Sequence, residues 1–119
     1  MDELAKLHCS PIGANTPRIN DHDVNQLIAK LHGWTLYEKG TEPRLEKYFE
    51  FEDFRKALAF TNQLAQVANE EDHHPALLTE WGKVTVSWWT HKIKGLHQND
   101  FIMAAKTEQI YGGRYGSQS

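Results

Sequence analysis

Apolar residues recur at intervals of three and four in the first half of the chain, the spacing that gathers them on one face of a helix. One such stretch follows Asn20 or Asp21, either of which can cap a helix, and ends before Gly33. Its apolar positions are Val24, Leu27, Ile28 and Leu31. The stretch after Asp53 is longer, and its apolar positions are Phe54, Ala57, Leu58, Thr61, Leu64, Ala65 and Ala68. We therefore expect two amphipathic helices, the second leading directly into His73.

Between and after these helices, the pattern changes to that of β-strands. Residues 34–38 and 44–51 are rich in aromatic side chains and flank a segment with Gly and Pro, which predicts a hairpin. Residues 76–81 and 83–91 predict a second hairpin that turns at Gly82. In its second strand the apolar side chains alternate with polar ones, as in a strand with one buried face. The alternating apolar positions are Val84, Val86 and Trp88.

The remaining segments complete the predicted domain. A last helix is expected after an N-cap at Gln98 or Asn99. Residues 1–19 carry scattered Pro, Gly and polar residues and predict a loosely ordered N-terminal arm, while 112–119 predict a flexible tail. Residues 20–111 then form one domain with the order helix, two strands, helix, two strands, helix. This order predicts an α+β fold, a four-stranded antiparallel sheet with helices packed on one face.

Composition narrows the class of protein. At 119 residues with 39% hydrophobic content, the chain can build one core. Acidic residues outnumber basic ones by 16 to 13, so no broad positive field favours direct nucleic-acid binding. Cys9 is the single cysteine, which predicts a reducing, cytoplasmic setting. No apolar run has the length of a signal peptide or a membrane span, so neither export nor membrane insertion is expected.

Three of the seven histidines are expected to converge. His73 and His74 open one strand of the second hairpin, and His91 closes the other, pointing away from its valine face. Imidazoles exchange protons readily near neutral pH, so the set suits acid–base catalysis. Asp100, in the first turn of the last helix, can orient an imidazole. Two tryptophans offer flat apolar surfaces for a heteroaromatic ring: Trp81 and Trp89.

Other interpretations of the histidines stay open. Adjacent histidines before a proline also occur in solvated loops, and a carboxylate in a first helical turn is favourable without any function. Three histidines and a carboxylate could also hold a catalytic zinc ion. Against zinc, the chain has no His-x-x-x-His on a helix and no cysteine pair, and neighbours in extended chain point apart. The other four histidines are interpreted as surface or loop residues: His8, His22, His32 and His97.

The spacing of these residues resembles the signature of the pterin-4a-carbinolamine dehydratase family. The pattern reads His73-His74-Pro75, Trp81, His91 and Asp100. The resemblance runs from about Trp34 through Glu108. Its stretch LLTEWGKVTVSWWTHKIKGLHQNDFIMAA, residues 77–105, is similar to bacterial members associated with phenylalanine hydroxylase.

The resemblance implies a reaction and roles for residues. It implies that 4a-hydroxytetrahydropterin loses water to give quinonoid dihydropterin. His73 and His91 are then the candidate acid and base, without a decision on which is which. His74 polarises the pterin, and Asp100 is a supporting carboxylate. The substrate-binding residues implied are Asp72, His73, His74, Pro75, Trp89, Thr90 and His91. Asn69 departs from the family pattern, which usually has an ionisable residue there; either this position is not essential for turnover, or Glu70 takes its place.

The resemblance also implies which partners to expect. No metal or organic cofactor is needed, and the small-molecule pterin is the substrate. A homodimer or homotetramer is expected, because uncovered edge strands favour pairing with another copy. A functional link to phenylalanine hydroxylase is implied, and binding to nucleic acid or to a membrane is not expected. The alternative function is a partner-binding or transcription-coactivator module of the same fold.

Overall fold

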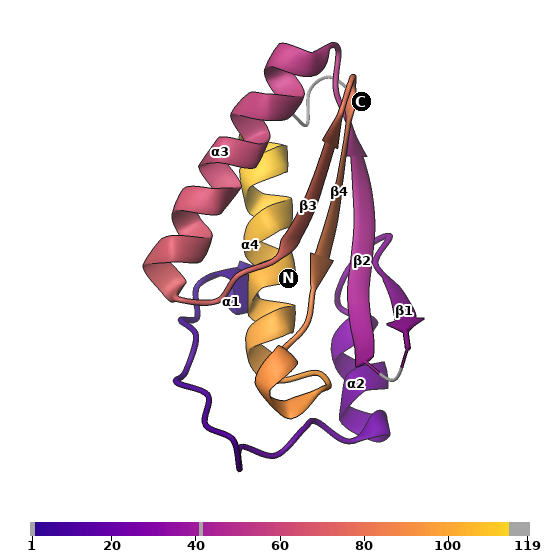
Figure 1. Cartoon of the computed structure of the whole chain (residues 1–119), viewed down its shortest axis with the longest axis vertical. Helices are drawn as coiled ribbons and strands as arrows, with labels where there is room; N and C mark the ends of the chain where they lie inside the picture. The colour runs from indigo at the N-terminus through magenta and orange to yellow at the C-terminus, as the bar shows by residue number, and fades with distance from the viewer. Residues whose placement is uncertain (1, 41, 115–119) are drawn as a thin grey trace.

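Four antiparallel strands form a single sheet in the order β1-β2-β4-β3 (Figure 1). The computed structural model describes residues 2–40 and 42–114. The strands are β1 (Thr35–Lys39), β2 (Glu42–Glu50), β3 (Ala76–Glu80) and β4 (Lys83–Trp88). Both predicted hairpins are confirmed, and β4 lies beside β2 in the middle of the sheet. The predicted α+β class with an antiparallel sheet is therefore confirmed.

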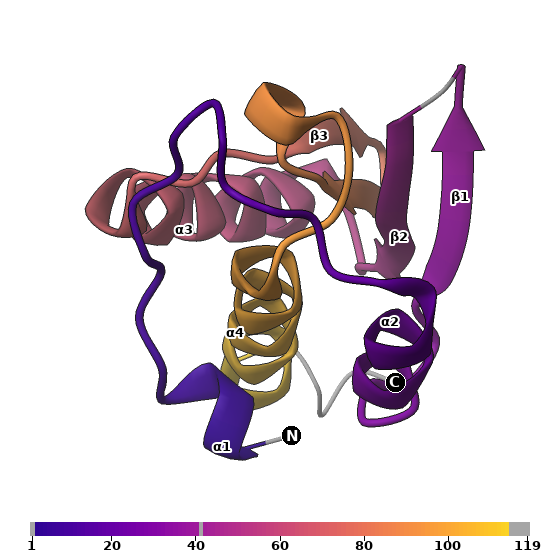
Figure 2. The same ribbon diagram turned by 90° about the horizontal axis from the view of Figure 1, so that it is seen from below.

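The helices lie on one side of this sheet (Figure 2). They are α1 (Asp2–Ala5), α2 (Asp21–Ile28), α3 (Phe54–Glu71) and α4 (Gln98–Arg114), with a 3₁₀ turn η1 (His91–Ile93) before α4. Asn20 caps α2 and Asp53 caps α3, each accepting a hydrogen bond from the backbone N–H three residues on. Both caps were predicted. No helix in the described part of the chain is long and apolar enough to cross a membrane.

The core lies between the sheet and helices α3 and α4. Val84, Val86 and Trp88 are fully buried on the inner face of β4, as their alternation predicts. The buried stripe of α3 is Ala57, Phe60, Leu64 and Ala68. The predicted stripe was wrong at Phe54 and Leu58, which are exposed. The face of the helix that packs on the sheet is the one that carries Phe60 and Leu64.

The ends of α2 and α4 differ from the prediction. Helix α2 stops at Ile28, well before Gly33, which lies in a following turn with φ +80°. Glu70 and Glu71 belong to the last turn of α3, although the helix dipole disfavours acids there. Helix α4 continues to Arg114, so it includes the start of the predicted tail; residues 115–119 lie outside the described residues.

The N-terminal arm makes more contacts than the sequence suggested. Helix α1 packs against α4, and Leu4 and Ala5 are buried there. The Lys106 ammonium of α4 donates to the Ala5 carbonyl at 2.8 Å. From α1 the chain passes the ends of α3 and α4 before it enters α2 (Figures 1 and 2). Polar contacts to α4 also hold the arm, and the hydrophobic pattern of a sequence cannot predict such contacts.

Candidate active site

The end of α3 places His73. Asp72 adopts a left-handed conformation with φ 53°, and the His73 N–H then bonds back to the Ala68 carbonyl at 3.1 Å. This turn directs the His73 side chain into the protein, where its ring stacks on Trp88 with 6.0 Å between centroids. His73 Nε2 lies 2.7 Å from an oxygen of Asp100. The predicted pairing of Asp100 with an imidazole therefore exists in the structure.

Asp100 is completely buried and accepts three hydrogen bonds. Its Oδ1 binds His73 Nε2, and its Oδ2 accepts from the Thr90 hydroxyl at 2.8 Å and from the His97 N–H at 2.9 Å. A buried carboxylate is costly unless donors compensate for its lost hydration. The three donors supply that compensation and fix the carboxylate in one orientation.

His97 caps helix α4, a role predicted for Gln98 or Asn99. The Asn99 N–H donates to His97 Nδ1 at 3.0 Å, while Asp100 reaches back to the His97 N–H. This reciprocal arrangement is that of a capping box. Burial, with the neighbouring charge of His73, lowers the pKa of His97 below its ordinary value. His97 lies in the loop before α4, as predicted, but the sequence did not indicate its capping role.

His91 is not part of a strand, contrary to the prediction. Strand β4 ends at Trp88, its last residue paired with β2, although β2 itself continues to Glu42. Thr90 instead pairs with Gly95 in an isolated bridge, and His91 opens the 3₁₀ turn η1 between them. Its side chain is 78% exposed, and its Nδ1 lies 3.0 Å from Glu42 of β2.

His74 points to the opposite side from His73. Its side chain is exposed, and its Nε2 lies 3.0 Å from the amide oxygen of Asn69 in the last turn of α3. Asn69, the position at which this chain departs from the family pattern, therefore contacts one of the three histidines.

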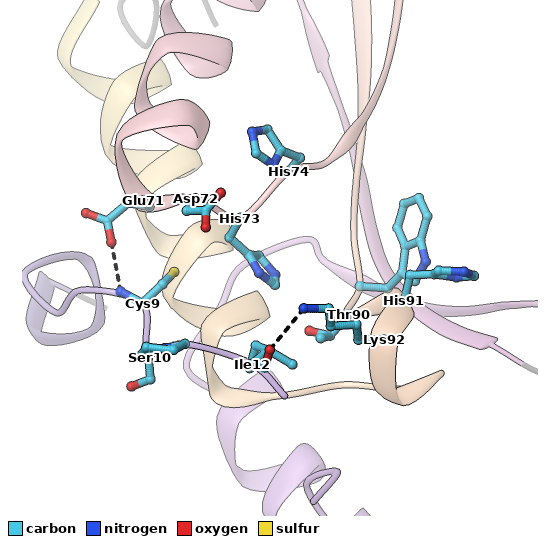
Figure 3. A pocket seen from close by; sticks show the side chains of 12 residues that line it. Cys9, Ser10, Ile12, Glu71, Asp72, His73, His74, Thr90, His91 and Lys92 are labelled. Carbon is cyan, nitrogen blue, oxygen red and sulfur yellow. Dashed lines mark hydrogen bonds between the residues drawn. The ribbon is translucent and has the colours of Figure 1, made fainter. Parts of the chain in front are cut away.

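The three histidines line one pocket of about 450 Å³, within the usual size range of small-molecule sites (Figure 3). Six predicted substrate-binding residues line it: Asp72, His73, His74, Trp89, Thr90 and His91. Pro75 is not among the lining residues, and Asp100 lies behind His73. Trp81 was expected here but is 74% exposed at the far end of β3, about 16 Å of strand away. Trp89 alone supplies the predicted indole.

The N-terminal arm forms one wall of the pocket, and the sequence pattern gave no sign of it. The wall consists of Cys9, Ser10, Pro11 and Ile12. The Glu71 carboxylate accepts from the Cys9 N–H and pairs with His8, both at 2.7 Å, while Lys92 donates to the Ile12 carbonyl (Figure 3). Asn99 binds both the N–H and the carbonyl of Ser10. Paired polar residues from distant segments carry no local sequence signal.

Ionisation of the arm residues is coupled. Burial, with the nearby charges of Glu71 and Asp100, raises the pKa of the Cys9 thiol to about 12. Burial opposes the charge on Glu71, but hydrogen bonds from Cys9 and His8 and the charge of Lys106 outweigh it, so the pKa of Glu71 falls below its ordinary value. The thiol at this wall is therefore protonated at neutral pH, and Glu71 is charged.

Each pocket histidine meets an oxygen that can only accept a hydrogen bond. Asp100 faces Nε2 of His73, Asn69 faces Nε2 of His74 and Glu42 faces Nδ1 of His91. The bonded nitrogen must therefore carry the hydrogen. The free nitrogen is then Nδ1 in His73 and His74, and Nε2 in His91. Such rings can accept a proton when neutral and donate one when charged. Among residues 2–40 and 42–114, no group of three or more His, Cys, Asp or Glu is placed to hold a metal ion.

The fold and this set of residues define an α+β domain with imidazoles and supporting oxygens around a small-molecule-sized pocket. The sequence model described as pterin 4 alpha carbinolamine dehydratase matches residues 17–110. A curated protein of Microcystis aeruginosa, provisionally named pterin-4-alpha-carbinolamine dehydratase, is 53% identical over 93% of this chain and 96% of its own length. The chain belongs to the pterin-4a-carbinolamine dehydratase family. The family resemblance noted in the sequence is thus confirmed.

Two solved structures are similar to this chain. A transcriptional coactivator/pterin dehydratase from Brucella melitensis matches with a TM-score of 0.72 and 32% identity, covering 79% of this chain and 98% of that one. A pterin dehydratase-like protein described as a RuBisCO assembly factor of the alpha-carboxysome matches at 0.58 with 24% identity, covering 68% and 92%. The second similarity concerns the fold alone. The family match starts at residue 17, so the pocket wall made by the arm lies outside it.

Proposed function

We propose that the protein is a hydro-lyase that removes water from 4a-hydroxytetrahydropterin and releases quinonoid dihydropterin. The observation that carries this proposal is the meeting of His73, His74 and His91 at one pocket, each with its own acceptor oxygen. Family membership supports the reaction class. The proposal places the enzyme in the cytoplasm, where it recycles pterin for an aromatic amino-acid hydroxylase such as phenylalanine hydroxylase.

The reaction needs one proton donated and one removed. An acid protonates the 4a-hydroxyl, the C4a–O bond breaks with its electrons leaving on water, and a base takes the proton from N5 as the C4a–N5 double bond forms. Imidazoles whose second nitrogen is already bonded can serve both steps, and positioned groups of this kind contribute about 10² to 10⁴ in rate. His73 and His91 fill these roles in the proposal, Asp100 supports His73, and His74 polarises the pterin.

The pterin ring has a suitable surface beside these groups. Trp89 lines the pocket, and the Arg44 guanidinium lies 3.6 Å from the centre of its indole, covering one face of the ring. Arg44 thereby fixes the orientation of the Trp89 ring. We propose this ring as the apolar contact for the planar pterin.

The direct test follows 4a-hydroxytetrahydropterin, generated by a hydroxylase, with and without the purified protein. The proposal predicts faster loss of the intermediate than without protein, and a loss of most of that acceleration in His73→Ala and His91→Ala. A Lys83→Ala variant, at the far end of β4, serves as the control and should keep wild-type turnover. If the wild-type protein gave no acceleration, the proposal would be wrong.

Partner binding is the competing function, favoured by the similarity to the Brucella protein, which is described as both a transcriptional coactivator and a pterin dehydratase. A binding role would survive the loss of both His73 and His91, whereas catalysis would not. Pull-downs with wild-type protein and the double alanine variant separate the two: equal capture of a specific partner by both, without dehydratase activity in either, would favour the binding role.

Self-association is part of the proposal. Strand β3 lies at an edge of the sheet, and its Leu78 side chain is 58% exposed. Uncovered edge strands favour pairing with another copy. We expect a dimer or tetramer by light scattering, and a Leu78→Lys variant should weaken it; a monomeric wild-type protein at micromolar concentration would contradict this.

A further inference from the structure

We infer that Glu42 is a positioning residue for His91, holding its imidazole in the Nδ1–H form and in a fixed orientation at the pocket. This inference rests on the proposed function, because it assigns Glu42 a part in the same reaction. Neither the histidine pattern nor the family resemblance pointed to Glu42, which lies 49 residues before His91 in the chain.

Glu42 is fixed in the sheet and lies beside the exposed side chain of His91. Its side chain is 22% exposed, whereas that of His91 is 78% exposed, and their closest atoms are 3.0 Å apart. Glu42 begins β2 and pairs with Lys39 of β1, so its backbone belongs to the sheet. His91 belongs to the short turn η1 outside the sheet. The contact therefore ties a loop imidazole to the sheet.

The surrounding groups keep the Glu42 carboxylate charged. The hydrogen bond with His91 is the largest influence lowering the pKa of Glu42, and the charges of His91 and Arg44 act in the same direction against partial burial. Arg44 is itself held over the Trp89 ring. Two charged residues of β2 therefore support the segment that carries His91: Glu42 contacts His91 itself, and Arg44 covers the Trp89 ring.

This support has a chemical consequence. In water both neutral tautomers of an imidazole are populated, and an exposed ring also rotates. A carboxylate at Nδ1 selects the form in which Nε2 has the free electron pair, and it stabilises the cation once Nε2 has taken a proton. His73 has the same kind of support from Asp100, through the other ring nitrogen. The two candidate proton-transfer groups are therefore each oriented by a carboxylate.

The test compares Glu42→Ala, Glu42→Gln and the control Glu46→Ala in the dehydratase assay. Glu46 lies on the same strand and its carboxylate also accepts a side-chain hydrogen bond, but its partner is Ser87, which does not line the pocket. We expect Glu42→Ala to lower kcat about 10-fold, the lower end of what hydrogen-bond partners of metal-bound histidines contribute, with KM changed less than about 2-fold. Glu42→Gln keeps an acceptor oxygen and should recover most of kcat. Glu46→Ala should match the wild type.

A second measurement reads the tautomer directly. Nitrogen-15 NMR of the histidine side chains above pH 8 should show His91 as the Nδ1–H form in the wild type and Glu46→Ala, and a shift toward the Nε2–H form in Glu42→Ala. A loss of hairpin stability alone would not produce this shift. With an active wild type, a kcat of Glu42→Ala equal to that of Glu46→Ala, or an unchanged His91 tautomer, overturns the inference alone. An inactive wild type removes the proposed function and this inference with it.

Discussion

Replacing Asp100 tests the buried centre of the site. In Asp100→Ala, three donors lose their acceptor: His73 Nε2, the Thr90 hydroxyl and the His97 N–H. Each unsatisfied buried donor costs about 1–3 kcal/mol. Because His97 is only half-buried, we take the lower part of this range and expect a loss of about 3–6 kcal/mol. Since small domains are stable by about 5–15 kcal/mol, this variant should be severely destabilised.

Asp100→Asn separates stability from activity. With the amide oxygen in the place of Oδ2, it still accepts from Thr90 and His97, and its NH₂ group then faces His73 Nε2. His73 can adapt by moving its hydrogen to Nδ1, so we expect a stability loss of only about 1–2 kcal/mol. Under the proposed mechanism the ring then presents the wrong nitrogen. Turnover should fall by at least about 10², since the corresponding change in serine proteases costs about 10⁴.

The assays are urea unfolding followed by circular dichroism, and dehydratase turnover. Thr107→Val is the matched control, because Thr107 is a fully buried polar residue of the same helix that accepts from the Trp88 indole N–H away from the pocket. It should lose about 1–2 kcal/mol and keep its turnover. The reasoning would be refuted if Asp100→Asn kept wild-type turnover, or if Asp100→Ala unfolded within about 1 kcal/mol of the wild type.

Three further predictions concern the surroundings of the site. The lowered pKa of His97 means that stability is lost as pH falls from about 6.5 through that pKa; His97→Asn keeps a capping oxygen and should flatten this part of the urea-midpoint profile. Because the pKa of Cys9 is about 12, maleimide labelling at about pH 7.5 should be slow, and Glu71→Ala should accelerate it by releasing the arm. Labelling at the rate of a free thiol in the wild type would contradict this. Gly82→Ala, at φ +73°, should destabilise by about 1–2 kcal/mol in urea unfolding; an unchanged midpoint would contradict it.

Local pattern was sufficient for the sheet and for the two helix caps. Alternation along β4 identified Val84, Val86 and Trp88 as buried because each side chain's direction follows from the strand period alone. The same pattern could not say where β4 ends. That point depends on contacts outside the strand: the pairing with β3 stops at Ser87, the pairing with β2 stops at Trp88, and beyond it Thr90 pairs with Gly95 instead. His91 was therefore assigned to a strand although it opens a 3₁₀ turn.

The polar part of the site was less accessible to prediction. Glu42 and His91 lie 49 residues apart, and Cys9 meets Glu71 across 62 residues. Such pairs involve single hydrogen bonds, which impose no periodicity on the sequence. The spacing of His73, His91 and Asp100 did indicate a common site, but the wall formed by the arm became visible only in three dimensions.

The contact made by Asn69 explains why its departure from the family pattern is compatible with the proposed chemistry. His74 uses Nε2 toward Asn69, and an amide oxygen accepts that hydrogen as a carboxylate would. What the ring requires at this point is an acceptor that fixes its tautomer, and proton exchange is not part of that role. In the proposed mechanism, protons move at His73 and His91, and both have carboxylate partners. The residue that cannot ionise thus supports the histidine to which no proton transfer is assigned.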